Sequence, residues 1–163
     1  GRLGNFINGE LYGRVSDAPW AMVFPRAEHF PLNLPWAAEM SERLGIEAVG
    51  AVNLPRHPSQ LYEALGEGVL LWLFLWFIIR PRKQYDGQLM GWYILGYGLV
   101  RFFIEYTRQP DANLGFILQL GPDQPLYLVG SLLNFTMGQL LCALMILAGL
   151  GLLFWRRYRS SRG

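Results

Sequence analysis

The fold of this chain is decided by the stretch "TMGQLLCALMILAGLGLLFW", residues 136–155. It contains no charged side chain, and a helix of roughly 20 apolar residues can cross the hydrocarbon core of a membrane. A second such stretch, 57–79, contains the run "VLLWLFLWFII". A third, 88–107, is apolar but carries Arg101 and Glu105. We therefore expect an all-α integral membrane protein, a polytopic helical bundle with about three full transmembrane helices.

The composition agrees with a membrane protein. Of the 163 residues, 52% are hydrophobic and only 16% are charged, against about a quarter charged in soluble domains. The net charge of +2 is too small to favour nucleic-acid binding, and we expect no such partner. Cys142 lies in an apolar run, where we interpret it as a small buried or lipid-facing side chain. No His or Cys pair has metal-ligand spacing, so we expect no metal site.

Basic residues mark one side of the membrane. "RPRK" at 80–83 follows the stretch 57–79, and "RRYRSSR" at 156–162 follows the stretch 136–155, whereas 109–135 has neither Lys nor Arg. Short cytoplasmic loops collect Lys and Arg. We therefore expect the C-terminal tail (156–163) and the loop 80–87 to be cytoplasmic. Residues 14–56 and 109–135 would then face the periplasm of a Gram-negative cell.

The region 14–56 is polar and rich in proline, and we expect it to form an outward-facing head or arm. Within it, "LPWAAEMSERLG" (34–45) predicts a short amphipathic helix with Pro35 near its start and Gly45 as its stop. "VGAVNLP" (49–55) predicts a short extended segment.

Charge inside the third stretch, 88–107, marks a candidate functional site, because intramembrane charge is costly. Arg101 and Glu105 are four residues apart, and Tyr97 and Arg108 share their helix face. Two interpretations remain open. The pair is either a structural ion pair between helices or part of a site. Arg108, near the end of the span, can also reach the interface without a direct role.

The opening stretch "GRLGNFINGELYG" (1–13) combines a cation, amides and a carboxylate with apolar residues. We expect it to be the outer end of a helix whose inner part lies upstream. Arg2 and Asn5 are neighbours on such a helix, and the planar donor fork of arginine matches phosphate. These residues would suit an anionic lipid headgroup. The alternative is a polar network of Arg2, Asn5 and Glu10 that packs helices together.

The opening stretch also resembles the signature of the bacterial prolipoprotein diacylglyceryl transferases. Every fixed position of that signature is filled, by Gly1, Arg2, Gly4, Asn5, Phe6, Asn8, Glu10 and Gly13. Three further stretches resemble the family in the same order: "PRHPSQLYEA" (55–64), "GYGLVRFFIEYTRQPD" (96–111) and "TMGQLLC" (136–142). The similarity covers nearly the whole chain, except about 25–54.

The resemblance implies an integral inner-membrane enzyme that usually has seven helices, of which this chain would be the C-terminal part. It implies transfer of the diacylglyceryl group of phosphatidylglycerol to the lipobox cysteine thiol of a prolipoprotein signal peptide. This is the first step of lipoprotein maturation and leaves a thioether and glycerol phosphate. The partners would be phosphatidylglycerol, prolipoprotein signal peptides and membrane lipid. The resemblance implies no metal and no organic cofactor.

The resemblance also implies roles for residues of the opening stretch. Arg2 matches the signature arginine that binds the phosphatidylglycerol headgroup. Asn5, Glu10 and Gly13 match signature positions that are important for activity, and we group all four as substrate-binding residues.

On the third stretch, Arg101 matches a second essential arginine, and Tyr97 and Glu105 match functionally important positions. We group these three as catalytic. The residue that takes the thiol proton stays open among Glu105, Glu10 and His57, since the family's proposed base is a histidine upstream of this chain. Glu105 has a second possible role, which is to orient Arg101.

Two other function classes stay open on the residues alone. The first is a non-catalytic lipid-binding membrane fragment. The second is part of a transporter in which Arg101 and Glu105 couple ion movement to transport. Transporters often contain inverted repeats, and none is visible in this sequence. A transporter would move its substrate without chemical change.

Overall fold

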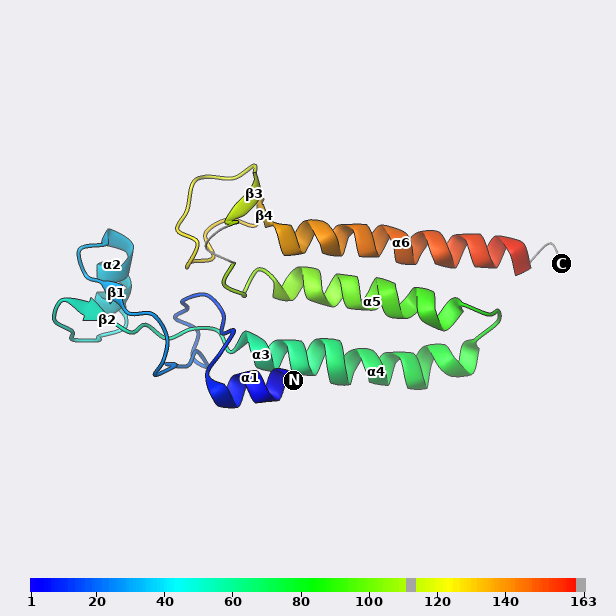
Figure 1. The fold of residues 1–163 in the computed structure, drawn as a ribbon, viewed down its shortest axis with the longest axis horizontal. Helices are drawn as coiled ribbons and strands as arrows, with labels where there is room; N and C mark the ends of the chain where they lie inside the picture. Colours follow the sequence, from blue (N-terminus) through cyan, green and yellow to red (C-terminus); the bar gives the residue numbers. More distant parts are fainter. Residues whose placement is uncertain (111–113, 161–163) are drawn as a thin grey trace.

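The computed structural model describes residues 1–110 and 114–160, and within them three long helices lie side by side (Figure 1). The first is continuous from Ser59 to Arg82, and we call it the long helix. Its segments are α3 (Ser59–Glu63), the π-helical η1 (Ala64–Leu70), α4 (Leu71–Leu73), the π-helical η2 (Phe74–Ile79) and the 3₁₀ turn η3 (Arg80–Arg82). The other two are α5 (Gln88–Ile104) and α6 (Met137–Ser160), which pack against each other.

Two helices among the described residues are long and apolar enough to cross a membrane. They are Ser59–Arg82, with a mean hydropathy of 1.6, and Met137–Arg159, with a mean hydropathy of 2.2. Their outer surfaces carry large exposed apolar side chains, including Trp72, Phe77 and Leu147. The prediction of a helical membrane protein is therefore confirmed.

Helix α5, in the third predicted span, is shorter than the other two long helices. It has 17 residues, which correspond to about 26 Å of helix against a hydrocarbon core of about 30 Å. The predicted stretch ran to Thr107, but the helix ends at Ile104. A turn follows, in which the backbone N–H and the hydroxyl of Thr107 donate to the carbonyl of Ile104 at 2.9 Å and 2.8 Å.

Glycines let α5 and α6 approach closely. A Cβ on Gly149 would lie 2.7 Å from the backbone nitrogen of Leu95, and one on Gly98 would lie 3.2 Å from the carbonyl oxygen of Cys142. Small residues at membrane helix contacts allow this backbone-to-backbone packing. Cys142 is buried in the contact, in agreement with its interpretation as a small buried side chain.

The start of α6 is fixed by a reciprocal cap. The backbone N–H of Thr136 donates to Gln139 Oε1 at 3.0 Å, and the N–H of Gln139 donates to Thr136 Oγ1 at 3.3 Å. This capping box satisfies two donors that an α-helix leaves free at its start. At its other end α6 continues to Ser160, beyond the predicted end at Trp155 and into the basic segment.

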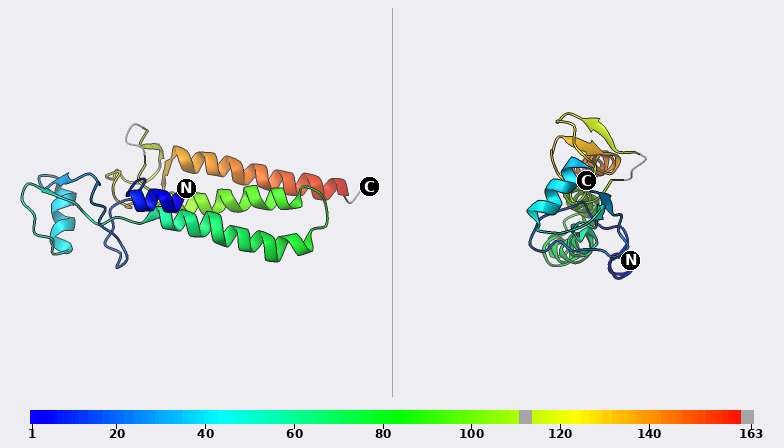
Figure 2. Two further views of the ribbon diagram at one scale, coloured as in Figure 1. Left: turned by 60° about the horizontal axis from the view of Figure 1, so that its bottom comes forward. Right: turned by 90° about the vertical axis from the view of Figure 1, so that its left-hand side faces the viewer.

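The head (14–56) is a small unit beyond one end of the bundle (Figure 2). Helix α2 (Pro35–Arg43) packs beside a two-stranded antiparallel sheet of β1 (Phe30–Pro31) and β2 (Ala51–Val52). Its core is made of Val15, Phe30, Ala37, Met40, Val52 and Leu54. The predicted short helix and extended segment are both confirmed.

The all-α expectation holds for the bundle but not for the outer segments. Besides the sheet in the head, β3 (Phe116–Gln119) pairs antiparallel with β4 (Asn134–Thr136) just before α6. In both places the chain returns beside itself, and the paired strands satisfy backbone groups that no helix uses.

The two basic segments lie at the same end of the bundle, opposite the head (Figure 1). Arg156 Nε donates to the carbonyl of Asp86 at 2.8 Å, and the hydroxyl of Tyr85 donates to the carbonyl of Leu153 at 3.2 Å. These contacts tie the turn between the long helix and α5 to the last turns of α6.

Candidate active site

A group of charged side chains lies where α1 (Arg2–Asn8), the long helix and α5 meet. We call it the charge cluster, and it consists of Arg2, Glu63, Glu67, Arg101, Glu105 and Arg108. One terminal nitrogen of Arg101 lies 3.0 Å from Glu63 Oε1 and 3.2 Å from Glu67 Oε1. The other lies 3.3 Å from Glu105 Oε2. The i, i+4 pair on α5 is therefore one part of a network that joins two helices.

Glu63 is the most shared member of the charge cluster. Its side chain is 1% exposed, and its oxygens lie 2.5 Å from Arg2 Nε, 3.0 Å from Arg101 and 3.7 Å from Arg108. One buried carboxylate thus holds α1 and α5 against the long helix. Neither Glu63 nor Glu67 was predicted from the sequence to belong to the site. The available signal was their position, two acidic residues four apart within an otherwise apolar span.

Glu105 is held from α6 as well as from Arg101. Its Oε1 accepts a hydrogen bond from the Thr136 hydroxyl at 3.2 Å. A Cβ on Gly138 would lie 2.6 Å from that same oxygen, so only glycine lets the carboxylate rest on the first turn of α6. The N-terminal end of a helix favours negative charge there.

After α1 the signature stretch continues as a loop, 9–13, which we call the signature loop. Residues at and just before the start of the long helix bind backbone groups of this loop. Gln60 Nε2 donates to the carbonyl of Glu10 at 2.6 Å, and Ser59 Oγ donates to the carbonyl of Leu11 at 3.2 Å. Gly13 donates its N–H to the carbonyl of His57 at 2.8 Å. A Cβ on Gly13 would collide with the carbonyl oxygens of Thr107 and His57. The position therefore requires glycine for backbone packing.

The structure divides the predicted site residues into two groups. Arg2 and Tyr97 line one cavity, and Arg101 and Glu105 adjoin it in the charge cluster. Asn5 instead lies in α1, and Glu10 and Gly13 lie in the loop that follows it. The carbonyl of Asn5 accepts the N–H of Glu10 at 2.8 Å where α1 ends, and the Glu10 residue is exposed. Only residues 2–8 of the predicted 1–13 helix end are helical.

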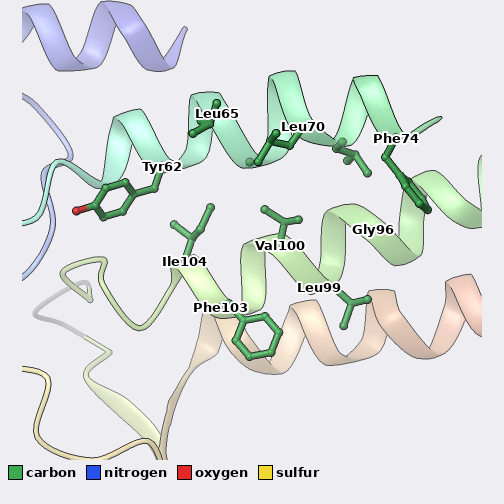
Figure 3. Close-up of a pocket in the computed structure, with 11 residues that line it drawn as sticks. Tyr62, Leu65, Leu70, Phe74, Gly96, Leu99, Val100, Phe103 and Ile104 are labelled. Atoms are coloured by element: carbon green, nitrogen blue, oxygen red, sulfur yellow. The ribbon is translucent and has the colours of Figure 1, made fainter. Parts of the chain in front are cut away.

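One hollow is lined by members of the charge cluster, and a second lies between two of the helices that carry the cluster. The first has a volume of about 400 Å³ and is lined by Gly1, Arg2, Leu3, Glu63, Ala64, Glu67, Gly68 and Tyr97. We call it the charged cavity. The second, of about 550 Å³, is an apolar groove between the long helix and α5. In Figure 3, Leu70 from the long helix faces Val100 from α5. A charged cavity beside an apolar groove suits an amphiphilic ligand.

Two buried arginines outside the membrane helices fix the outer end of α5. Arg14, 1% exposed, donates from Nε to the carbonyl of Arg108 at 2.9 Å and from a terminal nitrogen to the carbonyl of Leu128 at 3.0 Å. Burial lowers the pKa of Arg14 to about 10, so it stays protonated at neutral pH. Arg14 was not predicted from the sequence, because nothing in its neighbours shows that it would be enclosed.

The second buried arginine, Arg56, lies between two aromatic rings. Its guanidinium carbon is 4.7 Å from the ring centre of Tyr12 and 4.8 Å from that of Phe30. A terminal nitrogen donates to Gln109 Oε1 at 2.6 Å. Burial lowers the pKa of Arg56, and the two aromatic faces offset part of the cost of removing the charge from water. Head, signature loop and the segment after α5 are thus held together.

The three candidates for a proton acceptor have different surroundings. Glu105 is engaged by Arg101 and Thr136. The His57 ring nitrogen Nδ1 lies 3.1 Å from the hydroxyl of Tyr62, and Glu10 is exposed on the signature loop. Among the described residues, no group of three His, Cys, Asp or Glu side chains is arranged to hold a metal ion.

The apolar helices and the charge cluster at their head end define a helical membrane protein with a candidate site for a charged amphiphile. The family model described as prolipoprotein diacylglyceryl transferase matches residues 1–155. The chain belongs to this family.

Relatives named phosphatidylglycerol–prolipoprotein diacylglyceryl transferase match along most of the chain. The relative from Treponema pallidum (strain Nichols) is 51% identical over 160 residues, which cover 94% of this chain and 48% of the relative. Those from Chlorobaculum tepidum and Pseudoalteromonas translucida are each 46% identical over 99% of the chain, covering 43% and 46% of their own lengths. The chain therefore spans about half the length of the curated relatives it matches. No solved structure matches it.

Proposed function

We propose that the protein containing this chain transfers the diacylglyceryl group of phosphatidylglycerol to the lipobox cysteine thiol of prolipoproteins. The observation that carries the proposal is the meeting of Arg2 and Arg101 on Glu63 at the charged cavity. These two arginines come from segments far apart in the sequence, in a family that is named for this reaction. The relatives' names supply both substrates, phosphatidylglycerol and prolipoprotein.

The reaction needs a thiolate and a stabilised leaving group. The cysteine sulfur attacks the glyceryl carbon that carries the phosphate ester, the carbon–oxygen bond breaks, and glycerol phosphate leaves with the bonding electrons. Negative charge grows on the phosphate as the bond breaks. Cations fixed beside that phosphate stabilise the transition state more than the ground state, which lowers the barrier. We assign this role to Arg2 and Arg101.

The thiol proton must be accepted by another group, since a free thiol has a pKa of about 8.5 and arginine stays protonated. Glu105, Glu10 and His57 remain candidates for this acceptor. We assign Glu105 the role of orienting Arg101, which its contacts with Arg101 and Thr136 support. Tyr97 would line the path of the headgroup, because it borders the charged cavity.

We assign Asn5, Glu10 and Gly13 to shaping the substrate-binding site through the signature loop. The carbonyls of Glu10 and Leu11 and the N–H of Gly13 are all bound by residues at the start of the long helix. This fixes the loop at the C-terminal end of α1, and α1 carries Arg2 at its other end. The apolar groove between the long helix and α5 would take lipid chains that enter sideways from the bilayer.

We propose that the chain lies in the bacterial inner membrane with α5 as a third span. The head and 109–135 would face the periplasm, and the C-terminus the cytoplasm. The meeting of both basic segments at one end of the bundle supports this orientation, since cytoplasmic ends collect Lys and Arg. The α5 helix runs between these two ends beside α6, and its outer side chains Tyr93 and Phe103 are apolar and exposed.

The test is an assay of transfer in membranes that contain the full-length gene product. Phosphatidylglycerol labelled in its diacylglyceryl group is mixed with a lipobox peptide, and with a matched peptide whose cysteine is replaced by serine. We expect label on the cysteine peptide only, together with release of glycerol phosphate. Binding of the lipid without transfer would contradict the proposal and favour a non-catalytic lipid-binding protein. Movement of an unmodified substrate across the membrane would favour a transporter.

A further inference from the structure

The charge cluster is formally neutral within the described residues, and this limits what it can bind. Its three arginines, Arg2, Arg101 and Arg108, are balanced by three carboxylates, Glu63, Glu67 and Glu105. The proposed substrate brings a phosphate diester with one negative charge. An anion added to a neutral, poorly hydrated site is unfavourable unless a cation is freed for it. One carboxylate must therefore give way.

Arg101 has no terminal nitrogen free for a phosphate. One is shared between Glu63 and Glu67 at 3.0 Å and 3.2 Å, and the other faces Glu105 at 3.3 Å. A phosphate that binds both terminal nitrogens of this guanidinium competes with these carboxylates for them. Which one is replaced depends on how firmly each is held and on which borders the charged cavity.

Glu63 and Glu105 are both held by more than Arg101. Glu63 has ion pairs with three arginines and is 1% exposed. Glu105 accepts a hydrogen bond from Thr136 at 3.2 Å and lies against Gly138 of α6. Moving either carboxylate would leave buried donors or cations on other elements without a partner, which is costly.

Glu67 differs from both in position and in partners. Among the described residues its ion pair is with Arg101 alone, and its other partner is the hydroxyl of Tyr97, which donates a hydrogen bond to it. Glu67 and Tyr97 both line the charged cavity with Arg2, so the two partners of Glu67 lie in or beside the cavity. A phosphate that enters this cavity would meet the Glu67 carboxylate before it reached Arg101. The phosphate and the Glu67 carboxylate carry like charges and repel each other, so the two anions compete for the Arg101 guanidinium.

We propose that Glu67 is an exchangeable counter-ion, which holds Arg101 while the charged cavity is empty and is displaced from it by the phosphate of the lipid. The proposal rests on the proposed function and adds a positioning residue to it. Glu67 sets how tightly the anionic lipid binds, and it reclaims Arg101 as glycerol phosphate leaves. The same competition applies to any phosphate monoester or diester that reaches the cavity.

The test compares Glu67→Gln with the unchanged full-length gene product and with Asp86→Asn. Gln keeps the size of Glu67 and removes its charge, and Asp86 is a surface carboxylate whose side chain is 86% exposed. Equilibrium binding of labelled phosphatidylglycerol in detergent micelles and the KM and kcat of transfer are measured for each protein. Inhibition by free glycerol phosphate is measured alongside, to separate the lipid headgroup from a free phosphate.

We expect Glu67→Gln to bind phosphatidylglycerol about fivefold more tightly or better, since a close competing charge has been removed. The KM should fall in parallel, and inhibition by glycerol phosphate should strengthen by a similar factor. Asp86→Asn should change none of these. In Glu67→Asp the shorter side chain draws the carboxylate back from Arg101, so phosphatidylglycerol should also bind more tightly, by a smaller factor than in Glu67→Gln. This variant replaces Glu67→Gln in the comparison if the Gln variant does not fold.

Unchanged or weaker lipid binding in Glu67→Gln would overturn the proposal. A collapse of kcat with binding unchanged would overturn it as well and would make Glu67 the proton acceptor. If the unchanged protein binds phosphatidylglycerol but shows no transfer, the proposed function fails. The binding comparison then still decides whether Glu67 competes with phosphate.

Discussion

At the scale of single residues, the charged side chains that are buried between the helices are paired with side chains of opposite charge. Glu63 holds Arg2, Arg101 and Arg108 from one buried position. Pairs of this kind add little net stability by themselves, but removal of one member leaves the others buried and unpaired. The charge cluster therefore fixes the relative positions of α1, the long helix and α5.

Gly13 gives a prediction that depends on backbone packing alone. In Gly13→Ala the added methyl group would collide with carbonyl oxygens of Thr107 and His57, so we expect a loss of about 1–3 kcal/mol of stability. Thermal unfolding in detergent measures it. The matched control is Gly151→Ala, since a methyl group added at Gly151 would have no atom within 4 Å. Equal unfolding temperatures for the two variants would show that Gly13 is not tightly packed against Thr107 and His57.

Four members of the charge cluster were singled out from the sequence, namely Arg2, Arg101, Glu105 and Arg108, whereas Glu63 and Glu67 were not. Arg101 and Glu105 lie four apart in one helix, so their pairing follows from helix geometry. Glu63 and Glu67 reach the same guanidinium from another helix. Which faces of two helices meet depends on tertiary packing, and a single sequence does not contain that information. Arg14 and Arg56 were missed for the same reason, since the segments that enclose them are distant in sequence.

At the scale of elements, the junction between α5 and α6 couples helix capping to the site. Thr136 caps α6 through Gln139 and also donates its hydroxyl to Glu105. The stretch "TMGQ" (136–139) carries the capping-box pattern, so this helix start was predictable from the sequence. The end of α6 was not, because its basic last turns look like a loop when only hydropathy is considered.

Thr136→Val tests this coupling. Valine has nearly the same shape but no hydroxyl, so both the cap of α6 and the hydrogen bond to Glu105 are lost. We expect a loss of about 1–2 kcal/mol of stability, measured by thermal unfolding in detergent, and slower transfer. Thr136→Ser keeps the hydroxyl and should stay close to the unchanged protein. If the valine variant proves as stable as the serine variant, the cap does not contribute as described.

At the scale of the whole molecule, the two ends of the bundle differ in chemistry. One end carries the basic segments, and the other carries the head with its own apolar core. Charge patterning along the sequence predicted this polarity without any structure. The packing of the head against the signature loop through Arg56 was not predictable, since most of the head, about 25–54, lies outside the stretches that resemble the family.

The orientation is tested with single cysteines in a form of the protein that has no others. Glu42→Cys lies on the exposed surface of the head and Gln84→Cys in the exposed turn at the basic end. With the outer membrane permeabilised, we expect a membrane-impermeant maleimide to label the first in intact cells and the second only after lysis. The reverse pattern would place the charge cluster near the cytoplasmic face and contradict the proposed access of the signal peptide.

The most direct test of arginine-assisted departure of the phosphate is the rate of transfer in Arg101→Ala and Arg2→Ala, made in the full-length gene product. Arg43→Ala is the matched control, since Arg43 forms a surface pair with Asp17 in the head. With normal membrane insertion, we expect kcat/KM to fall by about 10²-fold or more in both site variants and to stay unchanged in the control. Undiminished transfer in both site variants would contradict arginine-assisted departure of the phosphate.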